Sequence, residues 1–188
     1  MRPIDVSEIK HIAEYELLRP EWRPRMIALK DRRRIRVGAH MTFLFENRET
    51  VLYQIQEMMR IERLQAPRDI AHEVRTYNEL IPAASELSAS LLIEYETPAE
   101  RDLWLPALLG LEHHIWLETG GGRAPARFDD RQISAERISS VQYVKFSLTP
   151  EQAAAFPQGA RLLIDHPKYL AQHELTAEQL KELAPDLR

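Results

Sequence analysis

The stretch FENRETVLYQIQEMMRIER, residues 45–63, is predicted to form one helix, and the other expected elements are arranged around it. At 100° per residue its apolar side chains fall on one side, which predicts a stripe that faces the core. That stripe consists of Val51, Leu52, Ile55, Met58 and Met59. The helix also carries more polar side chains than packing against a core requires, so their purpose is the first question that the sequence raises.

A second row of side chains lies beside this stripe. Thr50, Gln54, Glu57 and Ile61 follow one another at helical spacing. Polar residues at the edge of a core either line a site or tie the helix to its neighbours by hydrogen bonds, and the second case is the more common one. Glu62 projects near the middle of the apolar stripe, where a buried carboxylate needs a partner.

Composition places the chain among ordinary globular proteins. It has 188 residues, of which 44% are hydrophobic and 29% are charged, enough for one core of good size. The absence of cysteine excludes disulfides, thiol nucleophiles and cysteine-ligated zinc or iron–sulfur clusters within this chain. No apolar run approaches the roughly 20 residues that span a bilayer, and the first residues lack the apolar segment of a signal peptide. We therefore expect a soluble, cytoplasmic protein without a membrane partner.

Charge is spread unevenly along the chain. The net charge is -4, but residues 19–36 carry eight basic residues and two acids, so this segment is +6 and the remainder is -10. Such a basic segment can meet an anionic partner or can pair with the chain's own carboxylates. A nucleic-acid-associated regulator is the third functional alternative. It is not favoured, because nucleic-acid binders usually show a basic domain and a recognisable motif.

The first 85 residues are expected to be mainly helical. Ser7 is a suitable N-cap for a first helix, Pro20 is expected to interrupt it, and a second helix is expected to start near Pro24. The segment 34–45 is rich in β-branched residues and broken by Gly38, which predicts an extended connection or a short strand. Further helices are expected over 45–63 and 67–82.

The pattern changes to short strands and short helices in the second half. Strands are predicted over residues 87–95, 112–118, 139–148 and 160–167. Short helices are predicted over residues 97–110, 149–156 and 176–187, the first of them capped by Thr97 and stopped by Gly110.

These elements predict an α+β fold. The helix-rich part covers 1–85, the strand-rich part 86–175 and a C-terminal helix 176–187. Because no linker separates these parts, we expect a single domain over 1–188, in which a helical N-terminal half packs on a mostly antiparallel or mixed C-terminal sheet.

Five runs of the sequence resemble one known family. They are RPEWRPRMIALKDRRRIRVG, LFENRETVLYQIQEMMRIE, YNELIP, GLE and IDHPKY. Together they resemble the bacterial family catalogued as domain of unknown function 3501, and the resemblance extends from about Tyr15 to Leu187. The family pattern assigns no roles to its residues. The residues of this chain that match it are Arg25, Lys30, Arg33, Arg34, Glu46, Asn47, Thr50, Gln54, Glu57, Arg60, Glu62, Tyr77, Asn78, Asp165 and His166.

The resemblance implies which proteins are encoded nearby, but it implies no reaction. Members of the family are often encoded beside a rubrerythrin-like di-iron protein and an iron–sulfur oxidoreductase. The leading hypothesis is therefore a non-catalytic binding or accessory protein whose partner is such an iron-dependent redox protein. Enzymatic activity, a homo-oligomeric state and a cofactor such as iron or another divalent metal stay open.

The candidate ligand site lies where the arginine-rich segment meets the helix over 45–63. There Arg33 and Arg34 could clamp an anionic group while Gln54 and Glu57 orient it. The other candidate ligand-binding residues are Glu46, Asn47, Thr50, Arg60, Tyr77, Asn78, Asp165 and His166. The last two adjoin at a strand end, where functional residues often lie, although a simple turn explains them as well.

The runner-up hypothesis is a metal-dependent enzyme or metalloprotein with a carboxylate and histidine site. Glu8 with His11, and Asp69 with His72, have the i, i+3 spacing found in di-iron carboxylate bundles. In residues 112–118, a strand would place Glu112, His114, Trp116 and Glu118 on one face, as ligands for a metal or as a solvated surface. The candidate metal ligands are Glu57, Glu62, His11, His72 and His114.

Overall fold

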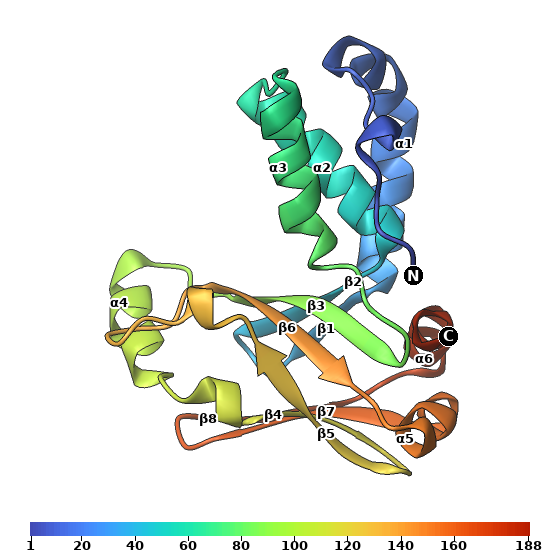
Figure 1. Ribbon diagram of the computed structural model, residues 1–188. Coiled ribbons are helices and arrows are strands. Elements are labelled where there is room, and N and C mark those ends of the chain that lie inside the picture. Colours follow the sequence, from blue (N-terminus) through green and yellow to red (C-terminus); the bar gives the residue numbers. More distant parts are fainter.

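The structure, a computed structural model, describes all residues 1–188 and consists of a curled antiparallel sheet with three helices on one side (Figure 1). The sheet has the strand order β1-β2-β3-β6-β5-β4-β7-β8, and every neighbouring pair is antiparallel. The strands are β1 (Arg34–Val37), β2 (Met41–Glu46), β3 (Glu86–Ile93), β4 (Ile115–Thr119), β5 (Gly122–Phe128), β6 (Val141–Ser147), β7 (Ala160–His166) and β8 (Tyr169–Glu174).

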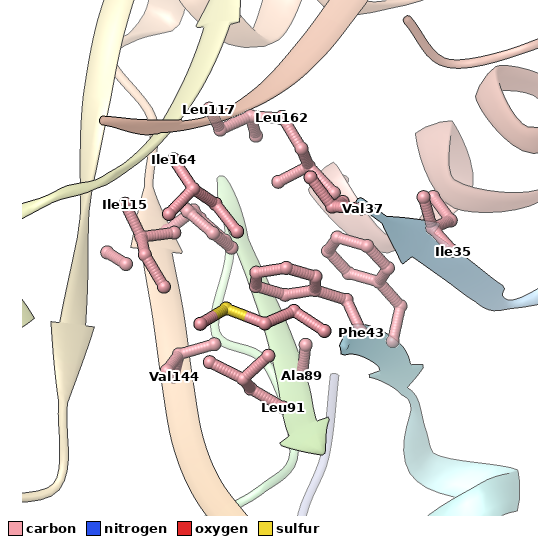
Figure 2. Close-up of a cluster of buried hydrophobic side chains, with 14 of the residues drawn as sticks. Ile35, Val37, Phe43, Ala89, Leu91, Ile115, Leu117, Val144, Leu162 and Ile164 are labelled. Carbon is pink, nitrogen blue, oxygen red and sulfur yellow. The ribbon is translucent and has the colours of Figure 1, made fainter. Parts of the chain in front are cut away.

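The sheet encloses the main core because alternate residues of each strand point to its inner face. Figure 2 shows these inward side chains gathered from strands on both sides of the curl, among them Phe43, Leu91, Val144 and Ile164. The core cluster contains 27 buried residues, which makes it much larger than the clusters between the helices.

One tyrosine joins the two edges of the sheet. The Tyr169 hydroxyl of β8 donates to the Val37 carbonyl of β1 over 2.8 Å and accepts from the His40 amide over 2.9 Å. Gly38 allows this approach: its φ is +71°, and a Cβ atom there would lie 2.5 Å from the Tyr169 hydroxyl oxygen. The sheet therefore closes almost into a barrel, with a side chain completing the seam.

Three helices form an arm that stands on the outer face of β2 and β3 (Figure 1). They are α1 (Ile12–Arg32), α2 (Arg48–Glu62) and α3 (Pro67–Asn78). Helix α2 lies between the other two and buries residues on both sides. Tyr53 packs with Met26 of α1, whereas Ile55 and Met59 pack with Val74 of α3.

The other three α-helices lie at the ends of the sheet (Figure 1). The α-helices are α4 (Pro98–Ala107), α5 (Pro150–Ala155) and α6 (Ala177–Leu183). The 3-10 helices are η1 (Val6–Glu8), η2 (Leu111–His113), η3 (Asp130–Gln132), η4 (Phe156–Gln158) and η5 (Ala184–Leu187). None of the helices combines the length and the apolar character that a membrane crossing requires.

The α+β class is confirmed, but the predicted division into a helical half and a strand-rich half is wrong. The hairpin β1–β2 lies inside residues 1–85, and α4 and α5 lie among the later strands. The reason is that residues 34–46 carry a complete apolar alternation, so they join the sheet rather than connect two helices. The strands β5 and β8 were not predicted.

Two expectations for the first helices are also wrong. Helix α1 runs without a break through Pro20 and Pro24, and its N-cap is His11 rather than Ser7. Both prolines lie on the exposed side of α1. The carbonyls that lose their backbone donors there can bind water, while Tyr15, Met26 and Leu29 hold the opposite side of the helix in place.

Candidate functional site

The outer face of the sheet beneath the arm carries polar side chains beside apolar ones, and α2 contacts this face at β2. Ser88 and Ser90 of β3 point outward because their neighbours Leu87, Ala89 and Leu91 fill the core. In the sheet, Ser88 lies between Glu46 and Lys145, and Ser90 lies between Leu44 and Tyr143. Two small serines between larger side chains leave a hollow that an apolar helix–sheet contact would have filled.

This hollow, which we call the arm cleft, has an inner and an outer part. The inner pocket has a volume of about 190 Å³, and the outer chamber has a volume of about 620 Å³. The two parts share Tyr77, Leu80 and Tyr143, so they adjoin each other. The inner pocket is lined mainly by Lys30, Leu44, Glu46, Val51, Gln54, Ser90, Leu92 and Val141, in addition to the shared residues.

Glu46 is the buried carboxylate of the inner pocket. Only 6% of this residue is exposed, and its oxygens accept hydrogen bonds from the hydroxyls of Ser90, over 2.8 Å, and Thr50. No lysine, arginine or histidine lies within salt-bridge distance of it, whereas the two other buried acids, Glu86 and Asp186, each contact a cation. Glu46 is therefore a buried carboxyl group whose side-chain partners are neutral hydroxyl donors.

Lys30 reaches the same pocket from the last turn of α1. Its Nζ atom lies 3.4 Å from the Gln54 Oε1 atom and 5.6 Å from the centre of the Tyr53 ring. No carboxylate lies within salt-bridge distance of Lys30. Lys30 thus lies on the wall of the pocket with one long contact to Gln54, and its positive charge stays available to an anionic group.

Two tyrosines separate the inner pocket from the outer chamber. Burial raises the pKa of the Tyr77 hydroxyl, and the neighbouring Tyr143 adds to this effect. Burial also raises the pKa of Tyr143, and the charges of Glu46 and Asp129 add to it. Both phenols therefore stay protonated at neutral pH and can donate hydrogen bonds to a ligand.

The outer chamber carries charges of both signs that are largely paired. Buried Glu86 accepts from Lys145 over 2.8 Å and from Arg127 over 3.3 Å. These two cations outweigh the effect of burial and lower the pKa of Glu86. Arg131 binds Asp129 over 2.7 Å and Glu79 across the mouth. The chamber is therefore polar but close to neutral, in contrast to the separate charges of the inner pocket.

The structure brings three predicted ligand-binding residues into the cleft, namely Glu46, Gln54 and Tyr77. Thr50 supports them, because its hydroxyl donates to Glu46. Asn47 does not reach the cleft, because its side chain accepts from the Thr50 amide and caps α2.

Glu57 and Arg60 lie on the other side of α2, against α1. Glu57 accepts hydrogen bonds from Tyr15 over 2.5 Å, from Arg19 over 2.8 Å and from Arg60 over 3.4 Å. Burial acts to raise the pKa of Glu57, but these three donors outweigh it and lower the pKa to about 2. The predicted ridge of Thr50, Gln54 and Glu57 is therefore divided between the cleft and a helix contact.

The predicted clamp of Arg33 and Arg34 is not formed. Arg33 is 1% exposed, and its guanidinium binds the Phe45 carbonyl over 2.8 Å and the buried Asp186 carboxylate near the C-terminus. Burial raises the pKa of Asp186 against the pull of Arg33. Arg34 is exposed and lies 3.4 Å from Asp31. Neither arginine lines the cleft, because the chain turns from α1 into β1 between Lys30 and Arg34.

Most of the basic segment is paired with the protein's own acids. Five of its eight basic residues form salt bridges within the chain: Arg19 with Glu57, Arg25 with Glu49, Arg32 with Glu182, Arg33 with Asp186 and Arg34 with Asp31. The other three, Arg23, Lys30 and Arg36, form no salt bridge, so only part of the segment's charge is paired within the chain.

Three other predicted residues lie outside the cleft. Asn78 exchanges two hydrogen bonds with the Ile4 backbone and so attaches the N-terminal segment to α3. Asp165 accepts from His114 over 2.9 Å and from Trp116 over 3.1 Å on the outer face of β4 and β7. His166 is buried and contacts the Leu109 carbonyl.

The candidate metal ligands are not brought together. No three or more histidine, aspartate or glutamate side chains are placed to hold a metal ion. His11 caps α1, His72 is exposed on α3, and Glu62 is exposed because α2 ends there. The predicted ladder over 112–118 is also absent, since Leu111–His113 forms η2 and the strand begins only at Ile115.

Sequence reasoning missed the floor of the cleft, which Ser88, Ser90, Tyr143 and Lys145 form. A signal was present in two predicted strands. Ser88 and Ser90 are separated by one residue, as are Tyr143 and Lys145, so the two members of each pair had to lie on one face of their strand. Lys30 matched the family pattern but was not proposed as a ligand. The pairing of β3 with β6, which brings these residues together, is not visible in either segment alone.

The comparisons with known proteins identify the family. The family model described as "Protein of unknown function (DUF3501)" matches residues 3–187. A crystal structure of a novel protein of unknown function from Burkholderia pseudomallei is 29% identical, covers 100% of both chains and superposes with a TM-score of 0.93. No curated protein matches the chain. The match over nearly the whole length shows that this chain belongs to the DUF3501 family.

Proposed function

We propose that this protein is a ligand-binding accessory protein whose arm cleft takes up a small polar molecule with an anionic group. The observation that carries the proposal is the unfilled hollow between the arm and β3, with Lys30 on its wall free of any carboxylate. A helix–sheet contact with a purely structural role would be filled by apolar side chains.

The neighbouring residues complete a site for such a group. The Lys30 ammonium supplies the charge, and its Nζ atom lies 3.4 Å from the Gln54 Oε1 atom. The protonated hydroxyls of Tyr77 and Tyr143 supply further donors at the entrance to the inner pocket. A site of this kind binds an anion through one point charge and directional hydrogen bonds.

The resemblance to the family adds the partner to this proposal. It points to an iron-dependent redox protein, rubrerythrin-like or an iron–sulfur oxidoreductase, and this part of the proposal rests on the sequence alone. Size-exclusion chromatography of the chain mixed with a rubrerythrin-like protein tests it. Co-elution supports an accessory role, and independent elution of the two proteins counts against it.

Nuclear magnetic resonance titration with 3-phenylpropionate and with inorganic phosphate tests the cleft. We expect at least one of them to shift the backbone amide signals of Ser88, Ser90 and Tyr143. Lys30→Met should weaken that binding about tenfold, whereas Lys168→Met, which removes an exposed lysine far from the cleft, should leave it unchanged. The proposal fails if neither anion shifts these signals, or if both lysine variants bind equally well.

A further inference from the structure

We infer that the inner pocket of the arm cleft recognises a zwitterion of the amino-acid class, with the ligand's ammonium group at Glu46 and its carboxylate at Lys30. This inference rests on the proposed function and adds the second charge of the ligand. Glu46 is the residue that would select the ligand's ammonium group.

The state of Glu46 is the first observation behind this assignment. Only 6% of the residue is exposed, and its two oxygens are met only by the hydroxyls of Ser90 and Thr50. A buried carboxylate is normally paired with a cation, as Glu86 is with Lys145 in the adjoining chamber. Each carboxylate oxygen can accept a further hydrogen bond, so Glu46 keeps acceptor capacity for an N–H group that enters the pocket.

The placement of Lys30 is the second observation. Glu46 and Lys30 line the same inner pocket, yet they do not form a salt bridge with each other. Two opposite charges that face one cavity without meeting leave room for a molecule that carries the complementary charge at each end. An α-amino acid has this arrangement, because its ammonium and carboxylate groups are attached to one carbon atom.

The remaining lining fits the rest of such a ligand. Leu44, Val51, Leu92 and Val141 give the inner pocket apolar walls around the two charges. Its volume of about 190 Å³ suits a small molecule, and the outer chamber of about 620 Å³ adjoins it. Tyr77 and Tyr143 line both parts, so they can contact both the charged end and the side chain.

Three matched ligands test the inference on the unmodified protein. L-phenylalanine carries both charges, 3-phenylpropionate lacks the ammonium group, and 2-phenylethylamine lacks the carboxylate. We expect L-phenylalanine to bind at least tenfold more tightly than either analogue in the titration of the Ser88, Ser90 and Tyr143 amide signals.

The variant Glu46→Gln tests whether Glu46 is the residue that binds the ligand's ammonium group. It keeps an acceptor oxygen for the Ser90 or Thr50 hydroxyl and removes the charge. We expect this variant to weaken the binding of L-phenylalanine about tenfold or more and to leave the binding of 3-phenylpropionate unchanged. The exposed control Glu136→Gln should change the affinity for neither ligand.

The outcomes separate this inference from the proposed function. Equal binding of L-phenylalanine and 3-phenylpropionate in the cleft overturns the zwitterion and leaves the anion site standing. If 2-phenylethylamine binds in the cleft as tightly as L-phenylalanine, the ligand's carboxylate contributes nothing. That result overturns the role of Lys30 in the inference and in the proposed function. If none of the three ligands shifts the cleft signals, the inference fails, and the proposed function fails with it only if inorganic phosphate also leaves these signals unchanged.

Discussion

On the α1 side of α2, the Glu57 carboxylate accepts hydrogen bonds from Tyr15, Arg19 and Arg60. On the sheet side of the same helix, Glu46 is more deeply buried and accepts only from two hydroxyl groups. The first carboxylate has all the partners that its charge needs, so it joins two helices. The second lacks a cation although Lys30 faces the same cavity, which is the arrangement expected where a ligand supplies the missing charges.

The difference also shows why residue type alone does not reveal a site. Arginine, lysine and glutamate occur on both sides of α2. What separates a structural cluster from a binding site is whether each charge already has a partner inside the protein. The variants below test that distinction, in the order of the effects expected.

The largest loss of stability should come from Arg33→Met. The change leaves buried Asp186 without its cation and leaves the Phe45 carbonyl without its donor, which costs about 3–5 kcal/mol. The neighbouring variant Arg34→Met removes an exposed charge and should cost less than about 0.5 kcal/mol. Urea unfolding of both at neutral pH measures the difference. Similar losses for the two variants would contradict the assignment of Arg33 to a closed structural pair.

Acid should lower the free energy of unfolding through protonation of Glu57. Because its pKa is lowered to about 2 in the folded state from an ordinary value of 4.5, its contribution is fully present above about pH 4.5 and is lost as the pH falls toward 2. The contribution is at most about 3 kcal/mol.

The variant Glu57→Gln tests that assignment. It should be less stable at neutral pH, and its unfolding free energy should fall less steeply between pH 4.5 and 2 than that of the unmodified protein. The control Glu62→Gln alters an exposed carboxylate at the end of α2 and should keep the original slope. An unchanged slope in Glu57→Gln would place the acid sensitivity elsewhere.

A smaller loss is expected from Thr50→Val, which preserves the shape of the side chain. It removes the hydroxyl that donates to Glu46 and accepts from the Asn47 amide, at a cost of about 1–2 kcal/mol. The control Thr76→Val changes an exposed threonine of α3. Thermal unfolding compares the two, and we expect a lower Tm only for Thr50→Val. Equal Tm values would mean that the cleft side of α2 tolerates loss of its polar contacts.

The smallest effect on stability should come from Lys30→Met. Its Nζ atom makes one long contact with Gln54 and none with a carboxylate, so its loss should change the free energy of unfolding by less than about 0.5 kcal/mol. Urea unfolding measures this change beside the Arg33→Met experiment. A loss of several kcal/mol would show that Lys30 is a structural residue and would remove the main support for the anion site.

Several elements followed directly from local patterns. The helix α2 with its stripe of Val51, Ile55 and Met59 was predicted, as were α4 with its Thr97 cap and the strands β3, β4, β6 and β7. Apolar period, capping residues and glycine stops act over a few residues, so they can be read from a single segment.

Other features depended on contacts between distant segments. Pro20 lies inside α1 because Tyr15 and Met26 pack on α2, and that packing outweighs the local tendency of proline to end a helix. Residues 34–46 form a hairpin because β3 offers them a partner. Glu62 was predicted to lie in the core stripe. It is exposed, because α2 ends at this residue.

For the candidate site, the sequence by itself determined which polar residues α2 would carry, and it pointed to Glu46, Gln54 and Tyr77. Only the tertiary structure decided that Glu57 and Arg33 are already paired and that Lys30 is not. The physical reason is that a charge is satisfied or left open by groups that fold against it from far along the chain. Spacing within one helix determines which face a side chain occupies, but not what that face meets.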